Sequence, residues 1–556
     1  MRFVQPSLLL FAAVAALGCP SDHSSPGAPT IASLSPSSGP PGTSVTIAGT
    51  NLGDATAATF NGVSASMTSK SDQALVVTVP GGATSGPVSV TTPAGTATTA
   101  AGAGFTVSAG GGGGSTTAMW LEFSGEANYE QPSIAVDAKG GIHTAYANRN
   151  QGPVRYAYCP ASCESEASWT RIDVSSAGES IGGSHPFPTL ALDPQGHPRV
   201  MFTHGMSIAG TNPDSTFTYE YAACDADCTS TASWKVTPLL TVDDLHYPQQ
   251  SGYFAIDSQG SAAFALHSQS SLMSEPTRLR YASCDANCSD ATSWGAVDLV
   301  EARPAAISLT FGGPGQPRIA FSRQAGYLDD GTLGYAMSYA QCDGDCLTAS
   351  SWQYRDLAQV GSDAQLSVGA EAGGKVRVAA AMGHAGPYAD KLAILACDAD
   401  CASDIDWKIS APFPLVPSSV SLVLDGKGGM GVGVGTADDL RVYVCASDCV
   451  GNGTWQGGVL ETTLQLNATA PVPLKPNCTT QGWRHFRDVG MAVDPNGKVR
   501  LVAGVIHLQG GFSGDCQANS DCPGGDVCVL STGKCSKQDC SVTTDVALDR
   551  LYLLPN

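Results

Sequence analysis

One spacing occurs six times in this chain of 556 residues and constrains its fold more than any other feature. A cysteine is followed four residues later by a second cysteine, and six residues after that by a tryptophan. The first cysteines of neighbouring copies lie 48 to 65 residues apart, which indicates one supersecondary unit used repeatedly. The copies are Cys159, Cys163 and Trp169; Cys224, Cys228 and Trp234; Cys284, Cys288 and Trp294; Cys342, Cys346 and Trp352; Cys397, Cys401 and Trp407; and Cys445, Cys449 and Trp455.

Each copy is preceded by two apolar segments with a tight turn between them. Residues 134–136 lead into the turn Asp137 to Gly140, and residues 422–424 lead into the turn Asp425 to Gly428. Each unit is therefore expected to hold four strands: A, an Asp-x-x-Gly turn, B, a loop, C ending at the first cysteine, and D starting at the tryptophan. Repeated four-stranded antiparallel units are typical of the blades of a β-propeller, whose ring leaves no long open edge.

A seventh copy is split between the two ends of this region. Residues 489–497 and 499–503 repeat strands A and B but are followed by no cysteine pair and no tryptophan. The C-terminal segment 550–554 can supply strand C, and the segment 120–123 can supply strand D. The sequence thus predicts seven blades over residues 118–556, closed by pairing of the two ends.

Residues 508–547 interrupt the seventh unit between its B and C strands. This stretch is rich in cysteine and glycine, and we expect a small disulfide-rich insert. Its five cysteines, together with the upstream Cys478, make six, which allow fifteen pairings, so the connectivity stays open. They are Cys478, Cys516, Cys522, Cys528, Cys535 and Cys540.

Residues 30–107 form a separate β-rich segment, and the glycine-rich residues 108–117 follow as a linker. The motifs Gly39-Pro40-Pro41-Gly42-Thr43, Phe60-Asn61-Gly62 and Ser85-Gly86-Pro87-Val88 resemble those of the IPT/TIG family. The resemblance implies an immunoglobulin-like β-sandwich that acts as a spacer or binding unit and carries no catalytic residues. The expected fold class is all-β: an IPT/TIG sandwich, then a seven-bladed β-propeller with a small disulfide-rich insert.

The N-terminus is typical of an export signal. The apolar run at residues 8–17 is too short to span a bilayer and ends in Gly18-Cys19, which resembles the lipobox of bacterial lipoproteins. The resemblance implies that residues 1–18 are removed, that Cys19 is acylated, and that residues 19–29 form a tether. We expect an exported protein anchored by lipid at the bacterial cell envelope, at the outer membrane or cell surface. An ordinary secretory signal is the alternative.

The cysteine pairs could form disulfides or could each supply half of a metal site. Zinc needs four ligands at one point, whereas each pair lies in the C–D hairpin of its own blade, so disulfides are favoured. Closing so short a loop stabilises by about 2 kcal/mol. Aspartates within the pairs could suggest calcium, but ordinary turns explain them better. No metal and no cofactor are expected. The tryptophans are expected to pack the blades and not to stack on sugars.

Charge excludes one class of partner. The chain has 28 Lys and Arg against 49 Asp and Glu, a net charge of −21, which repels phosphate backbones. We therefore expect no nucleic acid partner. Membrane contact is expected only through the N-terminal lipid, and the protein is expected to be a monomer.

Histidine placement suggests a ligand face. Seven of the ten histidines lie just before an A strand or near the end of a B strand, where the D–A and B–C connections share one face. Polar capping of strand ends is the alternative explanation, because surface loops are polar in any case. The predicted ligand-binding residues are His185, His204, His246, Tyr247, His267, Arg323, His384, His485 and His507.

Two functions compete. The first is a surface binding or adhesion protein for an extracellular glycan or protein. The second is a polysaccharide lyase, which needs a histidine or tyrosine base, or a glycoside hydrolase, which needs two facing carboxylates such as Glu130 and Glu301. The sequence contains no nucleophile motif, phosphate loop or dinucleotide fingerprint, so binding is preferred and no catalytic residue is assigned.

Overall fold

The computed structural model describes most of the chain in segments. They are residues 27–39, 43–80, 83, 85–100, 103–107, 117–121, 129–148, 153–175, 187–205, 216–243, 252–268, 278–301, 304–327, 333–371, 373–403, 407–413, 415, 417–451, 453–463, 465–466, 479–510, 512–515, 527–529, 534–536 and 546–554. Among these residues, no helix is long and apolar enough to cross a membrane. The predicted signal segment 1–18, the predicted acylation site Cys19 and residues 108–116 of the predicted linker 108–117 lie outside the described residues.

The chain divides into two compact units, and the first ends at Val107. It is a β-sandwich whose strands alternate buried and exposed residues, with Phe60 and Phe105 packed edge to face at 5.1 Å in its core. Asn61 and Gly62 of the family motif both have positive φ and form the tight turn between two paired strands. The strands are β1 (Thr30–Ser35), β2 (Ser38–Gly39), β3 (Ser44–Thr50), β4 (Ala57–Phe60), β5 (Val63–Lys70), β6 (Ala74–Thr78), β7 (Val88–Thr92), β8 (Gly95–Thr98) and β9 (Thr106–Val107).

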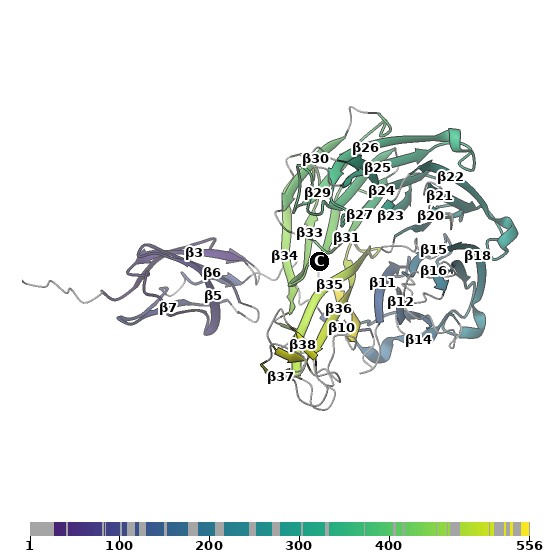
Figure 1. Ribbon diagram of the computed structural model, residues 1–556. Helices are drawn as coiled ribbons and strands as arrows, with labels where there is room; N and C mark the ends of the chain where they lie inside the picture. Colours follow the sequence, from purple (N-terminus) through teal and green to yellow (C-terminus); the bar gives the residue numbers. More distant parts are fainter. Residues whose placement is uncertain are drawn as a thin grey trace, which may run out of the picture. The chain divides into compact units, whose positions relative to one another are not determined.

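The second unit is a β-propeller of seven four-stranded antiparallel sheets (Figure 1). In six blades the strands run A-B-C-D in chain order. These are β11 (Tyr129–Val136), β12 (Ile142–Asn148), β13 (Val154–Cys159) and β14 (Thr170–Asp173); β15 (Thr189–Leu192), β16 (Pro198–Gly205), β17 (Thr216–Ala223) and β18 (Lys235–Asp243); β19 (Phe254–Ile256), β20 (Ala262–Ser268), β21 (Arg278–Cys284) and β22 (Gly295–Glu301); β23 (Pro304–Phe311), β24 (Pro317–Tyr327), β25 (Leu333–Cys342) and β26 (Trp352–Val360); β27 (Gln365–Glu371), β28 (Lys375–Ala381), β29 (Leu392–Cys397) and β30 (Lys408–Phe413); and β31 (Ser419–Leu424), β32 (Met430–Gly435), β33 (Asp439–Cys445) and β34 (Trp455–Thr462).

The inner A strands contact one another in ring order, and the A strand of blade seven contacts that of blade one. A hydroxyl on one inner strand repeatedly accepts a backbone N–H of the next. Ser133 Oγ accepts from Leu190 at 3.0 Å, and Ser308 Oγ accepts from Val368 at 3.1 Å. These bonds satisfy buried polar groups while joining neighbouring blades.

Blade seven is built from both ends of the region, as the sequence predicts. Its strands are β35 (Thr479–Val493), β36 (Val499–Gly510), β40 (Val546–Leu553) and β10 (Thr117–Trp120), in that order across the sheet. The outer strand differs from the prediction, because Trp120 ends β10 and does not begin it. No disulfide hairpin joins C to D in this blade, so strand pairing alone sets the register.

The predicted cysteine-rich insert lies between β36 and β40. Three short strands, β37 (Phe512–Asp515), β39 (Lys534–Ser536) and β38 (Val527–Val529), form its sheet. Cys516, Cys522 and Cys540 lie outside the described residues, as does Cys478.

All six predicted disulfides are present, from Cys159–Cys163 to Cys445–Cys449. The tryptophan that follows each pair donates its Nε1–H to the carbonyl of the second cysteine, at 2.8 to 3.1 Å. In blades two to five its ring also packs on the aromatic residue three places before the first cysteine of the preceding blade. These four tryptophans therefore pack blade against blade, which agrees with the predicted packing role.

Candidate functional site

The A–B turns carry a repeated carboxylate. Asp137 Oδ1 accepts the backbone N–H of Lys139 and of Gly141, both at 2.8 Å. These two bonds fix the turn and leave Oδ2 directed toward the next strand. The same pair of bonds, at 2.7 to 2.9 Å, forms at Asp193, Asp257, Asp425 and Asp494.

The residue that lies six places after the first residue of each A–B turn differs between the blades, and it lies on strand B beside the turn. Four blades have an arginine there, and its Nη1 donates to the carbonyl at the end of strand C, at 2.5 to 3.1 Å. In blades two and seven the Nη2 of this arginine also donates to the turn aspartate, at 2.7 and 2.8 Å, so the guanidinium connects the A–B turn with the end of strand C. In blades four and five Nη2 donates instead to an aspartate that follows strand C, at 2.6 Å. The four are Arg199, Arg318, Arg377 and Arg500.

Blade one has a histidine at this position. His143 Nδ1 lies 2.6 Å from the Tyr156 hydroxyl, and His143 Nε2 lies 3.4 Å from Asp137 Oδ2. The Tyr158 hydroxyl donates to the same Oδ2 at 3.5 Å, and its ring centroid is 4.6 Å from that of His143. With Nε2 protonated toward the carboxylate, Nδ1 accepts from Tyr156, so one neutral tautomer satisfies the whole group.

Burial sets the protonation states of this group. Desolvation lowers the pKa of His143 against the opposing effect of Asp137, so the ring is neutral at pH 7. Burial also raises the pKa of Tyr156 and of Tyr158, and the nearby Asp137 carboxylate adds to the effect. Desolvation acts to raise the pKa of Asp137, but the hydrogen bonds from its turn amides and the nearby His143 together outweigh it, so this pKa is lowered.

Next to this group lies a pocket of about 610 Å³ between blades one and two. Its walls come from the A–B turns of both blades and from the C–D connection of blade two. It therefore opens on the face of A–B and C–D connections, opposite the face favoured by the sequence. Polar lining residues include Asp137, His143, Tyr158, Gln195, His197 and Asp225.

Three of these groups resemble a metal site. One ligand atom each of Asp193, His197 and Asp225 lies within 4.8 Å of the others. Arg199 Nη2, however, donates to Asp193 Oδ2 at 2.7 Å and to Asp225 Oδ1 at 2.5 Å. The guanidinium already supplies the positive charge between the carboxylates, so the donor set fits an ion-pair network and not a cation site.

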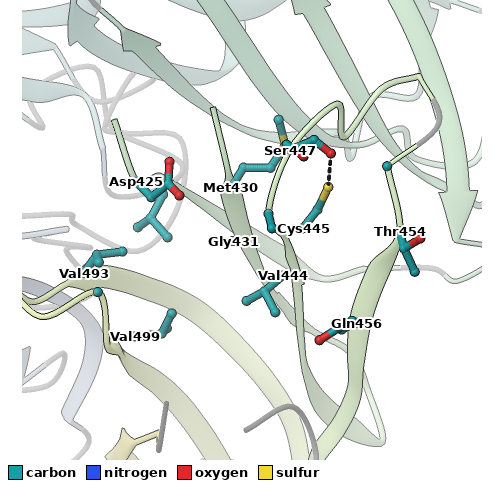
Figure 2. A pocket seen from close by; sticks show the side chains of 14 residues that line it. Asp425, Met430, Gly431, Val444, Cys445, Ser447, Thr454, Gln456, Val493 and Val499 are labelled. Carbon is teal, nitrogen blue, oxygen red and sulfur yellow. Dashed lines mark hydrogen bonds between the residues drawn. The ribbon is translucent and has the colours of Figure 1, made fainter. Parts of the chain in front are cut away.

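A second pocket of about 550 Å³ lies on the same face between blades six and seven (Figure 2). The position that holds arginine in blade seven is Gly431 in blade six, so none of the described side chains fills the space beside Asp425. Valines from both blades line much of the remaining wall.

Three of the predicted ligand residues have described side chains, and each is paired within its own blade. His204 Nδ1 lies 3.4 Å from Glu220 Oε1. Arg323 forms a two-pronged ion pair with Asp356 on the outer strand, at 2.5 and 3.1 Å. His384 is exposed and lies 2.6 Å from Asp390 Oδ1, a bond that raises the pKa of the histidine.

The other predicted positions are placed only in part. His267, His485 and His507 lie in β20, β35 and β36, but their side chains are outside the described residues. His185, His246 and Tyr247 lie outside them altogether. Of the proposed glycosidase pair, the Glu130 side chain is not described, and the exposed Glu301 lies 3.9 Å from Arg278.

Sequence reasoning missed His143 and His197, which are two of the three histidines left out of the predicted face. A signal for them was available. His143 lies six residues after Asp137, and His197 lies four residues after Asp193. His143 occupies the position at which four other blades have arginine. Aligning the repeats on the turn, and not on the cysteines, would have shown it.

The seven sheets, the ring of inner strands and the disulfide in each of six blades define the class of protein: a disulfide-stabilised, seven-bladed β-propeller. Residues 29–107 match the IPT/TIG domain family, so the first unit is an IPT/TIG domain. A search of curated proteins found no match to the chain.

Solved structures resemble the chain only loosely. An α-L-arabinanase of Penicillium chrysogenum, complexed with arabinobiose, is 12% identical, with a TM-score of 0.40 over 63% of this chain and 99% of the enzyme. An ulvan lyase is 10% identical, with a TM-score of 0.43 over 68% and 91%. An auxiliary nutrient binding protein of Bacteroides thetaiotaomicron is 10% identical, with a TM-score of 0.35 over 85% and 94%. At these scores the likeness gives no information on the ligand of this chain.

Proposed function

We propose that this chain is an exported binding protein that holds an uncharged carbohydrate in the pocket between blades one and two. The observation that carries the proposal is the arrangement around Tyr158. Its ring packs beside the His143 ring, while its hydroxyl and the Asp137 carboxylate lie together at 3.5 Å on the pocket wall. An apolar surface next to directional hydrogen-bonding groups is the usual composition of a small-molecule site.

The chemistry of the lining favours hydroxyl-rich ligands. Carboxylates accept hydrogen bonds from sugar hydroxyls, Gln195 and His197 can donate or accept, and the ring of Tyr158 offers a face to sugar C–H groups. The carboxylates of Asp137 and Asp225, together with the net charge of −21, repel uronates and sulfate esters. The proposed ligand is therefore a neutral glycan, in place of the acidic glycans that histidine-based binding on the other face would favour.

The same groups argue against a lyase at this site. A tyrosine that removes a proton needs a lowered pKa, whereas burial and the neighbouring carboxylate raise the pKa of both Tyr156 and Tyr158. His143 has a lowered pKa, but its two nitrogens are already engaged by Tyr156 and Asp137. These groups are therefore suited to binding a carbohydrate and not to cleaving it.

We also propose that the mature protein is anchored by lipid on Cys19 at the bacterial cell envelope. The six disulfides support export to an oxidising compartment, because such bonds rarely persist in the cytosol. Labelled fatty acid should enter the parent protein but not a Cys19→Ser variant, and the variant should leave the membrane fraction. Equal membrane association of the two, with no label in the parent, would disprove the anchor.

Glycan-array screening of the full chain, followed by calorimetric titration of the best oligosaccharide, tests the carbohydrate site. Tyr158→Phe removes one hydroxyl and should weaken binding about fivefold or more, since a lost hydrogen bond in such a site costs about 1 kcal/mol or more. His197→Gln should weaken it less. Tyr354→Phe, an exposed tyrosine away from the pocket, is the matched control. Unchanged affinity in the Tyr158→Phe protein would place the ligand elsewhere.

A further inference from the structure

The pocket between blades six and seven lies where blade six lacks the arginine that four other blades have on strand B. Position six after the turn residue is arginine in four blades and histidine in blade one, and it is Ala263 in blade three and Gly431 in blade six. In blade three the neighbouring blade compensates, because Gly315 N–H donates to Asp257 Oδ2 at 2.8 Å. In blade six the space beside the Asp425 carboxylate is a cavity of about 550 Å³.

Blade seven shows what fits such a space. Arg500 Nη1 donates to the carbonyls of Val499 and Leu554, at 3.2 and 3.1 Å, and its Nη2 donates to Asp494 Oδ2 at 2.8 Å. One planar guanidinium thus binds two carbonyls and one carboxylate. The geometry suits a guanidinium better than an ammonium, because its N–H groups form a rigid fork.

Blade six presents the same three acceptors without the arginine. Met430 pairs with Cys445 across strands B and C, as Val499 pairs with Leu554, so the carbonyls of Met430 and Cys445 correspond to those that Arg500 binds. Asp425 corresponds to Asp494, and its Oδ1 holds the turn amides of Lys427 and Gly429 in the same way, at 2.7 and 2.8 Å. Its Oδ2 is therefore placed as the third acceptor.

The remaining walls suit an alkyl chain. Figure 2 shows Asp425, Val493 and Val499 along one side of the pocket, with Val444 and Gln456 across from them. Three of these residues are valines, which can pack against the methylene groups of a long side chain while its charged end reaches the carboxylate. The net charge of −21 further favours a cation over an anion.

We propose that this pocket binds an alkylguanidinium group from outside the chain, such as the side chain of an arginine, in the place that an internal arginine occupies in blades two, four, five and seven. The site is independent of the carbohydrate pocket, which lies between blades one and two. The ligand supplies the cation that the repeat lacks here, with its guanidinium on Asp425 and the carbonyls of Met430 and Cys445.

Calorimetric titration of the full chain with 1-butylguanidine, using n-butylamine for comparison, tests the proposal. Butylguanidine should bind at least fivefold more tightly than butylamine. Asp425→Asn keeps the Oδ1 acceptor of the turn but replaces the charged oxygen, and it should weaken butylguanidine at least tenfold. Asp438→Asn, an exposed carboxylate in the B–C connection of the same blade, should leave it unchanged.

A second variant fills the pocket from within. A Cβ on Gly431 would lie 3.1 Å from Val423 Cγ2 and 3.4 Å or more from its other neighbours, so a side chain needs only a small shift there. Gly431→Arg should abolish butylguanidine binding and raise the melting temperature, since the restored arginine stabilises the folded state as a bound ligand would. Gly431→Ala, which leaves the pocket open, should still bind.

Several results would overturn the proposal. These are equal binding of butylguanidine to the parent and Asp425→Asn proteins, equal binding to a folded Gly431→Arg protein, or no binding to the parent at millimolar concentration. A capped arginine amide separates the two sources of the ligand. Binding comparable to butylguanidine supports an arginine within a partner protein, and binding of butylguanidine alone supports a free small molecule.

Discussion

Tyr281 of blade three packs edge to face on Trp352 of blade four, with ring centroids 5.0 Å apart and planes at 61°. Both rings are almost fully buried, and Trp352 Nε1 also donates to the Cys346 carbonyl at 2.9 Å. One tryptophan therefore holds its own disulfide hairpin and fastens its blade to the preceding one. This double role explains why the tryptophan keeps an invariant distance from the cysteines.

Replacing this tryptophan should destabilise the propeller strongly. Trp352→Ala is expected to lower the free energy of unfolding by about 3–5 kcal/mol, because it leaves a cavity between two blades. Tyr354→Ala, two residues along the same strand and exposed, is the matched control and should cost much less. Denaturant unfolding of the three proteins measures the difference, and similar losses for both variants would refute interblade packing by Trp352.

Each short disulfide should contribute modestly. A protein with both Cys284→Ala and Cys288→Ala is expected to lose about 2 kcal/mol of unfolding free energy, as the loop-closure estimate gives for so short a ring. The Trp294 bond to the carbonyl of residue 288, at 2.8 Å, uses the backbone and remains possible. Chemical denaturation without reductant gives the value. A loss above about 5 kcal/mol would mean that the bridge does more than restrict one hairpin.

Closure of the ring depends on the last strand. Leu551 is fully buried on β40, which pairs with both β36 and β10. Leu551→Ala should cost about 2–5 kcal/mol, the range found for buried leucines. The same change at the exposed Leu347 provides the control. If the two variants unfold at the same denaturant concentration, β40 does not hold the ring together.

The buried histidine should make stability depend on pH. The pKa of His143 is lowered from 6.5 on folding, so below about pH 6.5 the unfolded chain takes up a proton that the folded protein resists. Its contribution is therefore present above pH 6.5 and is lost as the pH falls. The groups facing it stay constant in this window, because Asp137 remains ionised and Tyr156 and Tyr158 remain neutral.

A His143→Gln variant should lose less stability than the parent between pH 7.5 and 5.5, as measured by urea unfolding at both pH values. The contribution of His384 to stability has the opposite pH dependence. Its carboxylate neighbours raise its pKa, so this contribution is lost as the pH rises. Identical pH slopes for the parent and the His143→Gln protein would show that His143 is not held neutral.

Local patterns were enough to predict the blades. Strand alternation, Asp-x-x-Gly turns and the cysteine spacing are properties of consecutive residues, so the number of blades, the six disulfides and the IPT/TIG sandwich follow from the sequence. Even the closure between β10 and β40 could be inferred, because a missing strand in one unit requires a donor elsewhere. The register of β10 could not be inferred from the sequence, since no hairpin connects β10 to β40.

The sites were decided by the tertiary structure. A pocket between blades depends on side chains that lie far apart in sequence, such as Tyr158 with His197, or Asp425 with Val499. No periodicity within one repeat reveals whether the neighbouring blade fills the space. The sequence by itself determined the scaffold, because strands and hairpins form from near neighbours. Packing of one blade on the next determined whether the space beside His143 and beside Gly431 is filled or left as a pocket.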